Sequence, residues 1–238
     1  MTVHIVPTLK DNYTYIIEQD ENLIIIDCGD AGPVIEFLKQ NKLTPSHLLC
    51  THHHGDHIDG LPHLKIDYPD IKIYAPEKDL YRIPHADHAL TADQKIVIGG
   101  MEVECIKTPG HTKNHLCFYI PSLKSIFTGD ALFSLGCGRL FEGTPEDLFH
   151  SMQKIKSLPD DTMLYCGHEY TQTNCRFSLS VEPENACLIT KMKQIEELRS
   201  AGKATLPVSL AEEKSNNLFL RAESIEKIAQ LRQLRDQF

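Results

Sequence analysis

Short runs of apolar, β-branched and aromatic residues recur along the first 168 residues of the chain, bounded by glycine, proline, asparagine or aspartate. This pattern is typical of β-strands. It predicts strands at Val3–Leu9, Tyr13–Glu18, Leu23–Asp27, Ser46–Cys50, Ile71–Ala75, Lys95–Ile98, Val103–Thr108, His115–Ile120, Ser125–Thr128 and Met163–Cys166.

Two segments between these strands have helical patterns, Pro33–Asn41 and Thr144–Leu158. The second begins with Thr144 as an N-cap, proline at the first helical position and Asp147 three residues after the cap, which together are a helix-start signature. The sequence therefore predicts strands mixed with a few helices in this part of the chain.

After residue 168 the strand pattern stops and apolar residues recur at helical spacing. One such stripe ends before Gly202 and the other lies near the carboxyl end; their members are Leu188, Met192, Ile195 and Leu198, and Ile225, Ile228, Leu231 and Leu234. We therefore expect an α/β (α+β) chain of two parts, a sheet-rich domain over residues 1–168 and a small helical domain over residues 169–238.

The composition of the chain disfavours some classes of binding partner. The 238 residues are 41% hydrophobic and 24% charged, which suits a globular protein with a sizeable core. Residues 169–238 hold ten basic and ten acidic side chains, so the formal net charge of −9 lies wholly in residues 1–168. This acidic balance disfavours nucleic acid or an anionic membrane as a partner.

The expected location is the cytoplasm. The chain has no apolar run of 18 residues and no signal-peptide pattern at its start. Its 8 cysteines lie far apart without a CxxC pair, which favours free thiols in a reducing compartment over a disulfide framework. We expect a soluble monomer.

Metal-binding side chains follow four of the predicted strands. Loops at one edge of a sheet can bring such groups together. The donors are His52, His54, Asp56 and His57 after Ser46–Cys50, His111 after Val103–Thr108, Asp130 after Ser125–Thr128, and His168 after Met163–Cys166. Five histidines and two aspartates exceed the four ligands of one tetrahedral zinc ion and suit two metals that share a carboxylate.

Other histidines carry less weight. His53 is out of phase with its neighbours in THHHGDH and is left out of the predicted ligand set. His115, on a predicted strand near His111, either packs in the core or orients a ligand. Lone histidines elsewhere are expected at the surface or in the core.

The motifs THHHGDH, TPGHT, TGDALF and YCGHEY resemble those of the metallo-β-lactamase superfamily, whose fold is an αββα sandwich with a binuclear metal site on one edge. Four further segments extend the resemblance over essentially the whole chain: PTLKDNYTYII, GCGRLFEGTPEDL, CGHEYT and LPVSLAEEKSNNLFLR. They resemble the glyoxalase II (hydroxyacylglutathione hydrolase) family. The expected fold is therefore this sandwich with a small C-terminal helical domain.

The resemblance also implies how the donors are shared. One metal would be held by His52, His54 and His111, the other by Asp56, His57 and His168, with Asp130 bridging them. Asp56 and Asp130 would act in catalysis together with a metal-bridging hydroxide. Zinc is the default metal, although iron and manganese suit the same ligands. Asp27 would orient a metal-bound histidine or cap the following turn.

The activity implied is hydrolysis of S-D-lactoylglutathione and related S-acylglutathiones to glutathione and D-lactate, the second step of methylglyoxal detoxification. A thiol leaves readily as a thiolate because its pKa is ~8.5, so no further general acid is required. The implied substrate contacts are Arg139, Phe141, Tyr170, Arg232 and Arg235. Arg139 and Phe141 replace the Lys and Tyr of the family pattern, and Phe141 cannot donate a hydrogen bond.

Four other functions remain open from the sequence. A persulfide dioxygenase would share the fold but use a single iron, so metal stoichiometry would distinguish it. Nucleases and lactonases also use this scaffold, but a nuclease would need a basic patch with interleaved aromatic residues. A non-catalytic metal-binding module is disfavoured because structural zinc sites normally have four ligands and no open position.

Overall fold

The computed structural model describes residues 1–19 and 22–238 and divides into two compact units. Unit 1 comprises Met1–Lys107 and Asn114–Leu123, and unit 2 comprises Thr108–Lys113 and Lys124–Phe238. Among the described residues, no helix combines the length and the apolar character that crossing a membrane requires.

Unit 1 contains a mixed six-stranded sheet with the order β1-β2-β3-β4-β5-β6. The first three strands are antiparallel and the last four, from β3 onward, are parallel. Their bounds are Thr2–Thr8, Asn12–Gln19, Asn22–Ile26, His47–Leu49, Lys72–Pro76 and His88–Leu90. The antiparallel strands β7 (Lys95–Ile98), β8 (Met101–Lys107) and β9 (Leu116–Ile120) follow.

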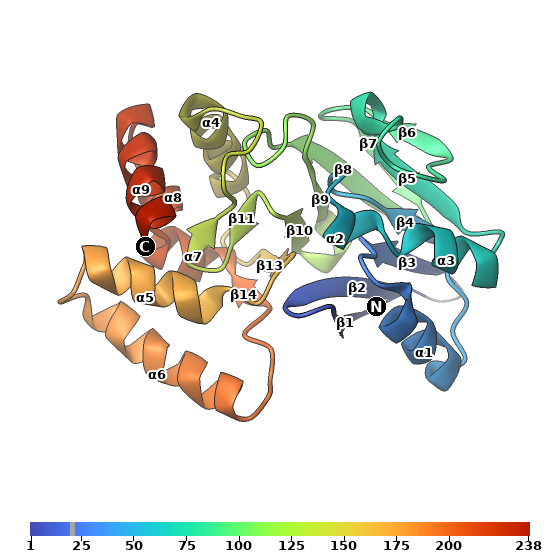
Figure 1. The fold of residues 1–238 in the computed structure, drawn as a ribbon, viewed down its shortest axis with the longest axis horizontal. Coiled ribbons are helices and arrows are strands. Elements are labelled where there is room, and N and C mark those ends of the chain that lie inside the picture. The colour runs from blue at the N-terminus through green and yellow to red at the C-terminus, as the bar shows by residue number, and fades with distance from the viewer. Residues whose placement is uncertain (20–21) are drawn as a thin grey trace. The chain divides into compact units, whose positions relative to one another are not determined.

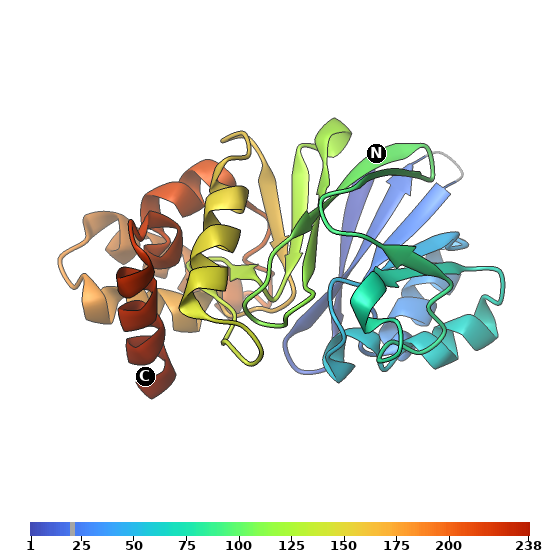
Figure 2. The same ribbon diagram turned by 90° about the horizontal axis from the view of Figure 1, so that it is seen from above.

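Helices cover one face of the six-stranded sheet (Figure 1, Figure 2). They are α1 (Ala31–Asn41), the single turn α2 (Gly55–Ile58) and α3 (Leu61–Asp67), and the short 3-10 helices η1 (Glu77–Asp79) and η2 (Pro121–Leu123) belong to the same unit. Alternate strand residues pack against them, since Leu23 and Ile25 of β3 share a buried cluster with Leu38 of α1 and Leu64 of α3. This packing fixes the ends of the strands that carry the donors of unit 1.

In unit 2, β10 (Ser125–Gly129) pairs in parallel with β13 (Met163–Cys166), and β13 pairs with the antiparallel strand β14 (Val208–Ser209). A short antiparallel pair, β11 (Leu132–Phe133) and β12 (Gly136–Cys137), follows β10. The helices are α4 (Pro145–Lys156), α5 (Thr171–Val181), α6 (Ala186–Ser200), α7 (Leu210–Asn216), α8 (Leu218–Arg221) and α9 (Ile225–Gln237).

Two helix pairs organise unit 2. Helices α5 and α6 pack through a buried cluster that includes Cys175, Leu188 and Ile195, while α4 and α9 lie side by side in both views (Figure 1, Figure 2). The predicted start of α4 is confirmed, because the Thr144 hydroxyl accepts from the Asp147 amide at 3.1 Å and the Asp147 carboxylate accepts from the Thr144 amide at 2.9 Å.

All ten predicted strands and the predicted helices are present, and the bounds of β7 and β13 match the prediction. The sequence did not predict α5 or the short strands β6 and β14. Because β14 lies between residues 169 and 238, that part of the chain is not purely helical. Seven of the eight cysteines are buried and Cys187 is exposed, as expected for thiols within apolar segments.

Candidate functional site

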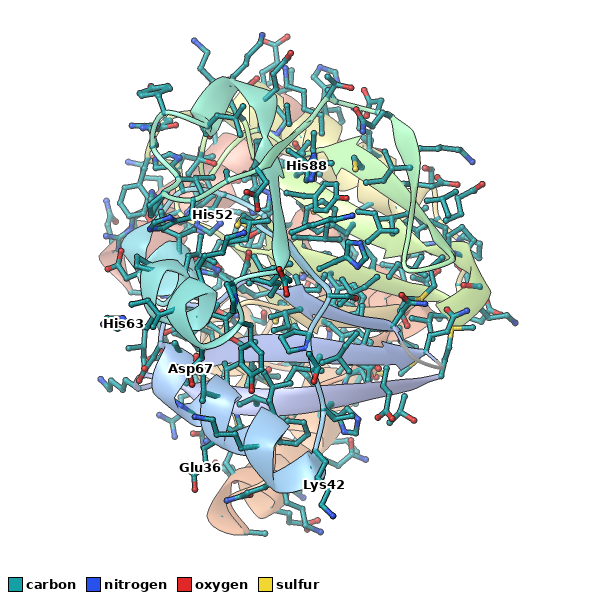
Figure 3. All side chains as sticks on the ribbon, turned by 90° about the vertical axis from the view of Figure 1, so that its right-hand side faces the viewer. Glu36, Lys42, His52, His63, Asp67 and His88 are labelled. Carbon is teal, nitrogen blue, oxygen red and sulfur yellow. The ribbon has the colours of Figure 1, made fainter. Side chains whose placement is uncertain are left out.

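The donors of unit 1 lie together on the segment between β4 and α3. The rings of His52 and His57 have centroids 4.2 Å apart, and those of His52 and His54 are 4.7 Å apart. His52 and His57 are buried, although Asp56 and His54 are only partly so. Figure 3 shows His63 on α3 away from His52, and that histidine is exposed, one of the two placements expected for lone histidines.

Asp27, directly after β3, holds two of these histidines in place. Its carboxylate accepts from the Thr51 amide at 2.7 Å, from the Thr51 hydroxyl at 2.7 Å and from His57 Nδ1 at 2.8 Å. His52 Nδ1 lies 3.0 Å from the Thr51 hydroxyl oxygen, which can accept a hydrogen bond from the Nδ1–H group because its own hydrogen is donated to Asp27. With Nδ1 engaged in both rings, Nε2 is the nitrogen suited to a metal.

The structure separates the two roles that the sequence left open for Asp27. Helix α1 is capped by Asp30, whose carboxylate accepts from the Gly32 amide at 2.9 Å. The contacts of Asp27 go to Thr51 and His57 instead.

Asp56 is held by two residues that the sequence analysis did not single out. Asn12 Nδ2 donates to the Asp56 backbone carbonyl at 3.1 Å and to its carboxylate at 3.0 Å. Gly29 lies so close that a Cβ there would be 1.9 Å from the same carbonyl oxygen. The backbone of Asp56 is therefore fixed from both sides.

The donors of unit 2 converge on one carboxylate. His111 Nε2 and His168 Nε2 lie 3.4 Å and 3.3 Å from the same oxygen of Asp130, and all three side chains are buried. His111 Nδ1 donates to the carbonyl of Arg139 at 2.9 Å, so Nε2 is again the nitrogen turned toward the other donors. This arrangement suits a bridging carboxylate flanked by two imidazole ligands.

Aromatic residues pack on the unit 2 donor histidines. The Tyr170 ring stacks on His168, with centroids 4.6 Å apart and planes 6° apart. Phe133 meets the His168 ring edge-on at 5.8 Å. Phe141 meets the His111 ring edge-on at 5.2 Å and is 61% exposed, so its outer edge can contact a bound molecule.

The three arginines predicted to bind substrate differ in exposure. The Arg139 side chain is 58% exposed, and its Nε lies 3.3 Å from Asp236. Arg235 is half-buried, donates to Asn174 Oδ1 at 3.3 Å and lies over the rings of Phe177 and Phe238. Arg232 is only 6% exposed and points into unit 2, which its predicted role did not anticipate.

A buried carboxylate in unit 1, Asp79 of η1, was also missed. It lies 3.3 Å from His53 Nδ1 and accepts from Asn114 Nδ2 at 2.8 Å. The two contacts of Asp79 join residues 26 and 35 positions apart, so no local pattern indicated them. His115, which the sequence left either in the core or beside a ligand, is buried and stacks on the donor His52 with ring centroids 5.0 Å apart.

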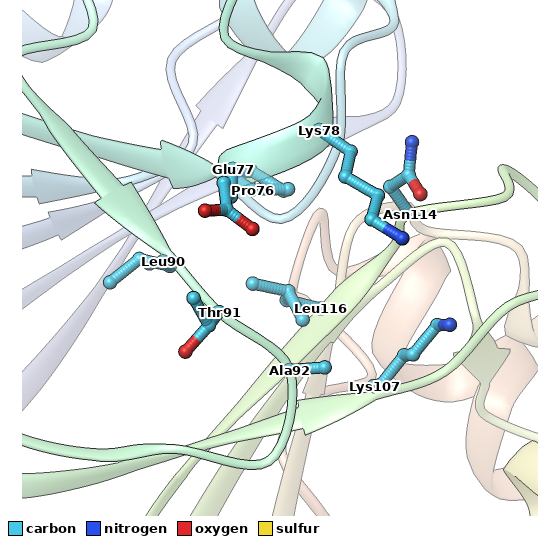
Figure 4. A pocket seen from close by; sticks show the side chains of 9 residues that line it. All are labelled: Pro76, Glu77, Lys78, Leu90, Thr91, Ala92, Lys107, Asn114 and Leu116. Carbon is cyan, nitrogen blue, oxygen red and sulfur yellow. The ribbon is translucent and has the colours of Figure 1, made fainter.

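Asn114 also lines a small pocket of unit 1 (Figure 4), together with Pro76, Glu77, Lys78, Leu90, Thr91, Ala92, Lys107 and Leu116. None of the predicted site residues lines this pocket. It is therefore separate from the donors.

The donor chemistry of each unit fits divalent metal ions. Asp27, His52 and His57 offer atoms that all lie within 4.8 Å of one another. Asp27 uses its oxygens for hydrogen bonds to Thr51 and His57, and so holds the His57 imidazole in a fixed orientation. Both units thus present imidazoles in a fixed orientation beside an aspartate, as metal ligands require.

Comparison with known proteins agrees with this chemistry. Residues 7–168 match the family model of the metallo-beta-lactamase superfamily, and residues 169–238 match that of the hydroxyacylglutathione hydrolase C-terminus. In fold, the crystal structure of the BLEG-1 B3 metallo-beta-lactamase superposes with a TM-score of 0.73 at 24% identity, over 93% of this chain and 100% of that one. The chain therefore belongs to the metallo-β-lactamase superfamily, and it has a metal site typical of that fold.

Relatives that match nearly the whole chain identify the family within this superfamily. The hydroxyacylglutathione hydrolase of Rhodopseudomonas palustris (strain HaA2) is 42% identical over 93% of this chain and 87% of its own length. The hydroxyacylglutathione hydrolase of Prochlorococcus marinus (strain MIT 9211) is 38% identical over 99% of this chain and 95% of its own length. The chain belongs to the hydroxyacylglutathione hydrolase (glyoxalase II) family. The expected fold is confirmed, with two mixed sheets flanked by helices and a helical C-terminal region.

Proposed function

We propose that this protein is a metal-dependent thioester hydrolase that cleaves S-D-lactoylglutathione and related S-acylglutathiones to glutathione and D-lactate, in methylglyoxal detoxification. The convergence of His111 and His168 on Asp130 carries the proposal, because it provides a carboxylate shared between imidazole ligands. Family membership over nearly the whole chain supports the choice of substrate.

The seven donors would hold two divalent ions. We assign His52, His54 and His111 to one ion, Asp56, His57 and His168 to the other, and Asp130 to both. Zinc is the proposed metal, with iron or manganese as alternatives, since imidazole and carboxylate ligands suit all three. Asp27 would orient His57, and through Thr51 also His52.

When bound, a pair of divalent ions lowers the pKa of water to about 7 and polarises a carbonyl group. The chain supplies two carboxylates, Asp56 and Asp130, and we assign them to catalysis together with the metal-bound hydroxide, which they would help to hold in place as metal ligands. The side chain of Asp56 is 41% exposed whereas that of Asp130 is 8% exposed, so Asp56 lies nearer to solvent. The glutathione thiolate leaves without protonation because its pKa is ~8.5.

Glutathione carries two carboxylates, so the substrate site needs cations on a protein that is acidic overall. We assign this role to Arg139, Arg232 and Arg235. In the described part of the chain, no carboxylate lies within ion-pair distance of Arg235, and burial together with the neighbouring Arg232 lowers its pKa. Tyr170 and Phe141 would line the same site, since each packs on a unit 2 ligand.

All of the proposed ligands belong to one chain, so no second copy is needed to complete the centre. We propose that the protein acts as a monomer in the cytoplasm, where the glutathione pool is kept reduced. We also propose residues 1–168 and 169–238 as its two domains, with the metal ligands in the first. Size-exclusion chromatography and cell fractionation test the assembly and the location.

The deciding experiment follows loss of the thioester absorbance of S-D-lactoylglutathione before and after chelation, together with elemental analysis. We expect hydrolysis that chelation abolishes, that added zinc restores, and that requires two metal ions per chain. Turnover that survives complete metal removal would overturn the proposal. One iron per chain with no thioester hydrolysis would favour the oxidoreductase alternative.

A further inference from the structure

His53 is the histidine of THHHGDH that the proposed metal centre does not use, and it lies between the donors His52 and His54 in the chain. Residues 52–54 belong to no helix or strand, so the hydrogen bonds of a regular element do not fix their conformation. Each residue has only two soft backbone dihedrals. An anchor on the His53 side chain would therefore limit how far the donor on either side of it can turn.

Asp79 of η1 provides such an anchor. Its carboxylate is buried, and Oδ2 lies 3.3 Å from His53 Nδ1. Arg82 Nη1 lies 3.8 Å from Asp79 Oδ1 and 3.4 Å from the same His53 nitrogen, so its charge compensates the buried carboxylate. Because Nδ1 can donate to Asp79 or accept from Arg82, the His53 ring is held in either tautomer.

The other oxygen of Asp79 holds a second segment of unit 1. Oδ1 accepts from Asn114 Nδ2 at 2.8 Å. The next residue, His115, is buried and stacks on His52 with ring centroids 5.0 Å apart and planes 25° apart. Asp79 thus joins the irregular stretch 52–54 to the residue that precedes His115. Losing its carboxylate would loosen both the chain around the donors and the ring that packs on one of them.

We propose that Asp79 is a positioning residue for the proposed metal ligands His52 and His54, acting through His53 and Asn114. The inference rests on the proposed metal centre and deepens it. It gives the remaining histidine of THHHGDH a part in the site without making it a ligand.

Asp27 and Asp79 would then serve different metal ions. The donor that Asp27 contacts directly is His57, which we assign to one ion. Asp79 acts on His52 and His54, which we assign to the other. Loss of the Asp79 contacts should therefore weaken the binding of one zinc ion more than that of its neighbour, whereas a general loosening of unit 1 would weaken both.

Two substitutions separate the hydrogen bonds of Asp79 from its charge. Asp79→Leu has a comparable size but removes both hydrogen bonds and the charge. Asp79→Asn removes the charge alone, because its amide oxygen can accept from Asn114 and its NH2 group can donate to His53 Nδ1.

Asp87 offers a matched control eight residues later in the same unit. Its carboxylate accepts from the Ile73 amide and from Lys65 Nζ, both at 2.9 Å, and neither residue is a metal donor. Asp87→Asn therefore perturbs a hydrogen-bonded aspartate of unit 1 without touching residues 52–54 or Asn114.

Zinc affinity is measured by competition with a chelator on protein loaded with two zinc ions, and circular dichroism of the metal-free variants reports folding. We expect Asp79→Leu to weaken one of the two zinc ions roughly ten-fold, the lower end of the usual effect of losing a group that orients ligands. Asp79→Asn should stay nearer to the wild type, and Asp87→Asn should bind both ions as the wild type does.

A folded Asp79→Leu chain that binds both zinc ions as tightly as the wild type would overturn the proposal. Equal weakening in Asp79→Asn and Asp79→Leu would overturn it too, because the effect would then follow the charge and not the hydrogen bonds. If Asp79→Leu does not fold, Asn114→Leu decides, since it removes one of the two hydrogen bonds at a partly exposed position. Wild-type zinc affinity in that variant would then reject the inference.

The zinc measurement uses no substrate. A failure of the protein to hydrolyse S-D-lactoylglutathione would therefore not be mistaken for a failure of this inference. A wild-type chain that binds fewer than two zinc ions would overturn the metal centre and this inference with it.

Discussion

His57 Nδ1 lies 2.8 Å from Asp27 Oδ2, and Asp27 is buried at the end of β3 with two further hydrogen bonds from Thr51. An asparagine at this position would present an amide in place of one acceptor oxygen. We therefore expect Asp27→Asn to weaken zinc binding by about 10–100-fold while the chain still folds.

Chelator competition measures this change. Asp30→Asn is the matched control, because it alters an aspartate three residues away whose carboxylate caps α1 by accepting from the Gly32 amide. Equal zinc affinities for Asp27→Asn and the wild type would remove Asp27 from the metal centre.

His54 contributes an imidazole to the donor cluster from a partly exposed position. Removing it should abolish thioester hydrolysis, because one metal ion loses a ligand. The melting temperature of the metal-free chain should stay within a few degrees of wild type, since the side chain fills no core space. His63→Ala, at an exposed position on α3, serves as the control and should keep full activity. Residual activity near the wild-type level in His54→Ala would contradict the ligand assignment.

Phe141 stands over the His111 ring with 61% of its surface exposed, and it lacks the hydroxyl that the family pattern has there. In Phe141→Tyr the added hydroxyl can donate one hydrogen bond to glutathione. A net gain of about 0.5–1.5 kcal/mol corresponds to a roughly 2–10-fold lower KM, with kcat unchanged. Steady-state kinetics measure both constants, and Phe141→Leu is the control for ring packing. An unchanged KM would mean that the hydroxyl finds no partner on the substrate.

Glu213 is fully buried in unit 2, and burial raises its pKa despite hydrogen bonds from Asn217, Leu135 and Ser134. A carboxyl whose pKa is higher in the folded than in the unfolded chain contributes stability below the unfolded value. That contribution is lost as pH rises through the folded value. The free energy of unfolding should therefore fall with rising pH, from about the ordinary glutamate pKa upward.

Glu213→Gln should remove this part of the pH dependence, because the amide does not ionise. Its oxygen can accept from Leu135 and Asn217, and its NH2 group can donate to the Ser134 hydroxyl, which rotates. Urea unfolding of both proteins at several pH values measures the difference. A difference that does not vary with pH would show that Glu213 titrates normally.

The strands were predictable because their buried residues form runs of apolar side chains in the sequence. In β3, Leu23, Ile24, Ile25 and Ile26 are all buried, which is the continuous apolar run expected of a strand covered on both faces. Helix α5 was not predicted because its buried residues are Thr171, Asn174, Cys175, Phe177 and Ser178, mostly polar or small. A helix that buries polar side chains leaves no apolar period to detect.

Some residues of the candidate site were also predictable from the sequence and others were not. The donors were predicted because His52, Asp130 and His168 come shortly after apolar strand segments, and loops at strand ends often carry functional groups. Asp27 was singled out because it directly follows the apolar run of β3. Asn12 was not singled out, since its contact with Asp56 joins residues 44 positions apart and depends on how β2 packs in the folded unit.

Gly29 and Gly138 each lie where a methyl group would meet the carbonyl oxygen of an aspartate donor, Asp56 in unit 1 and Asp130 in unit 2. Neither position has space for a side chain of any kind. Directed evolution toward another acyl group or another metal should consequently recover both glycines in every active clone. Useful diversity is to be sought at Phe141 and Arg139, whose side chains are exposed.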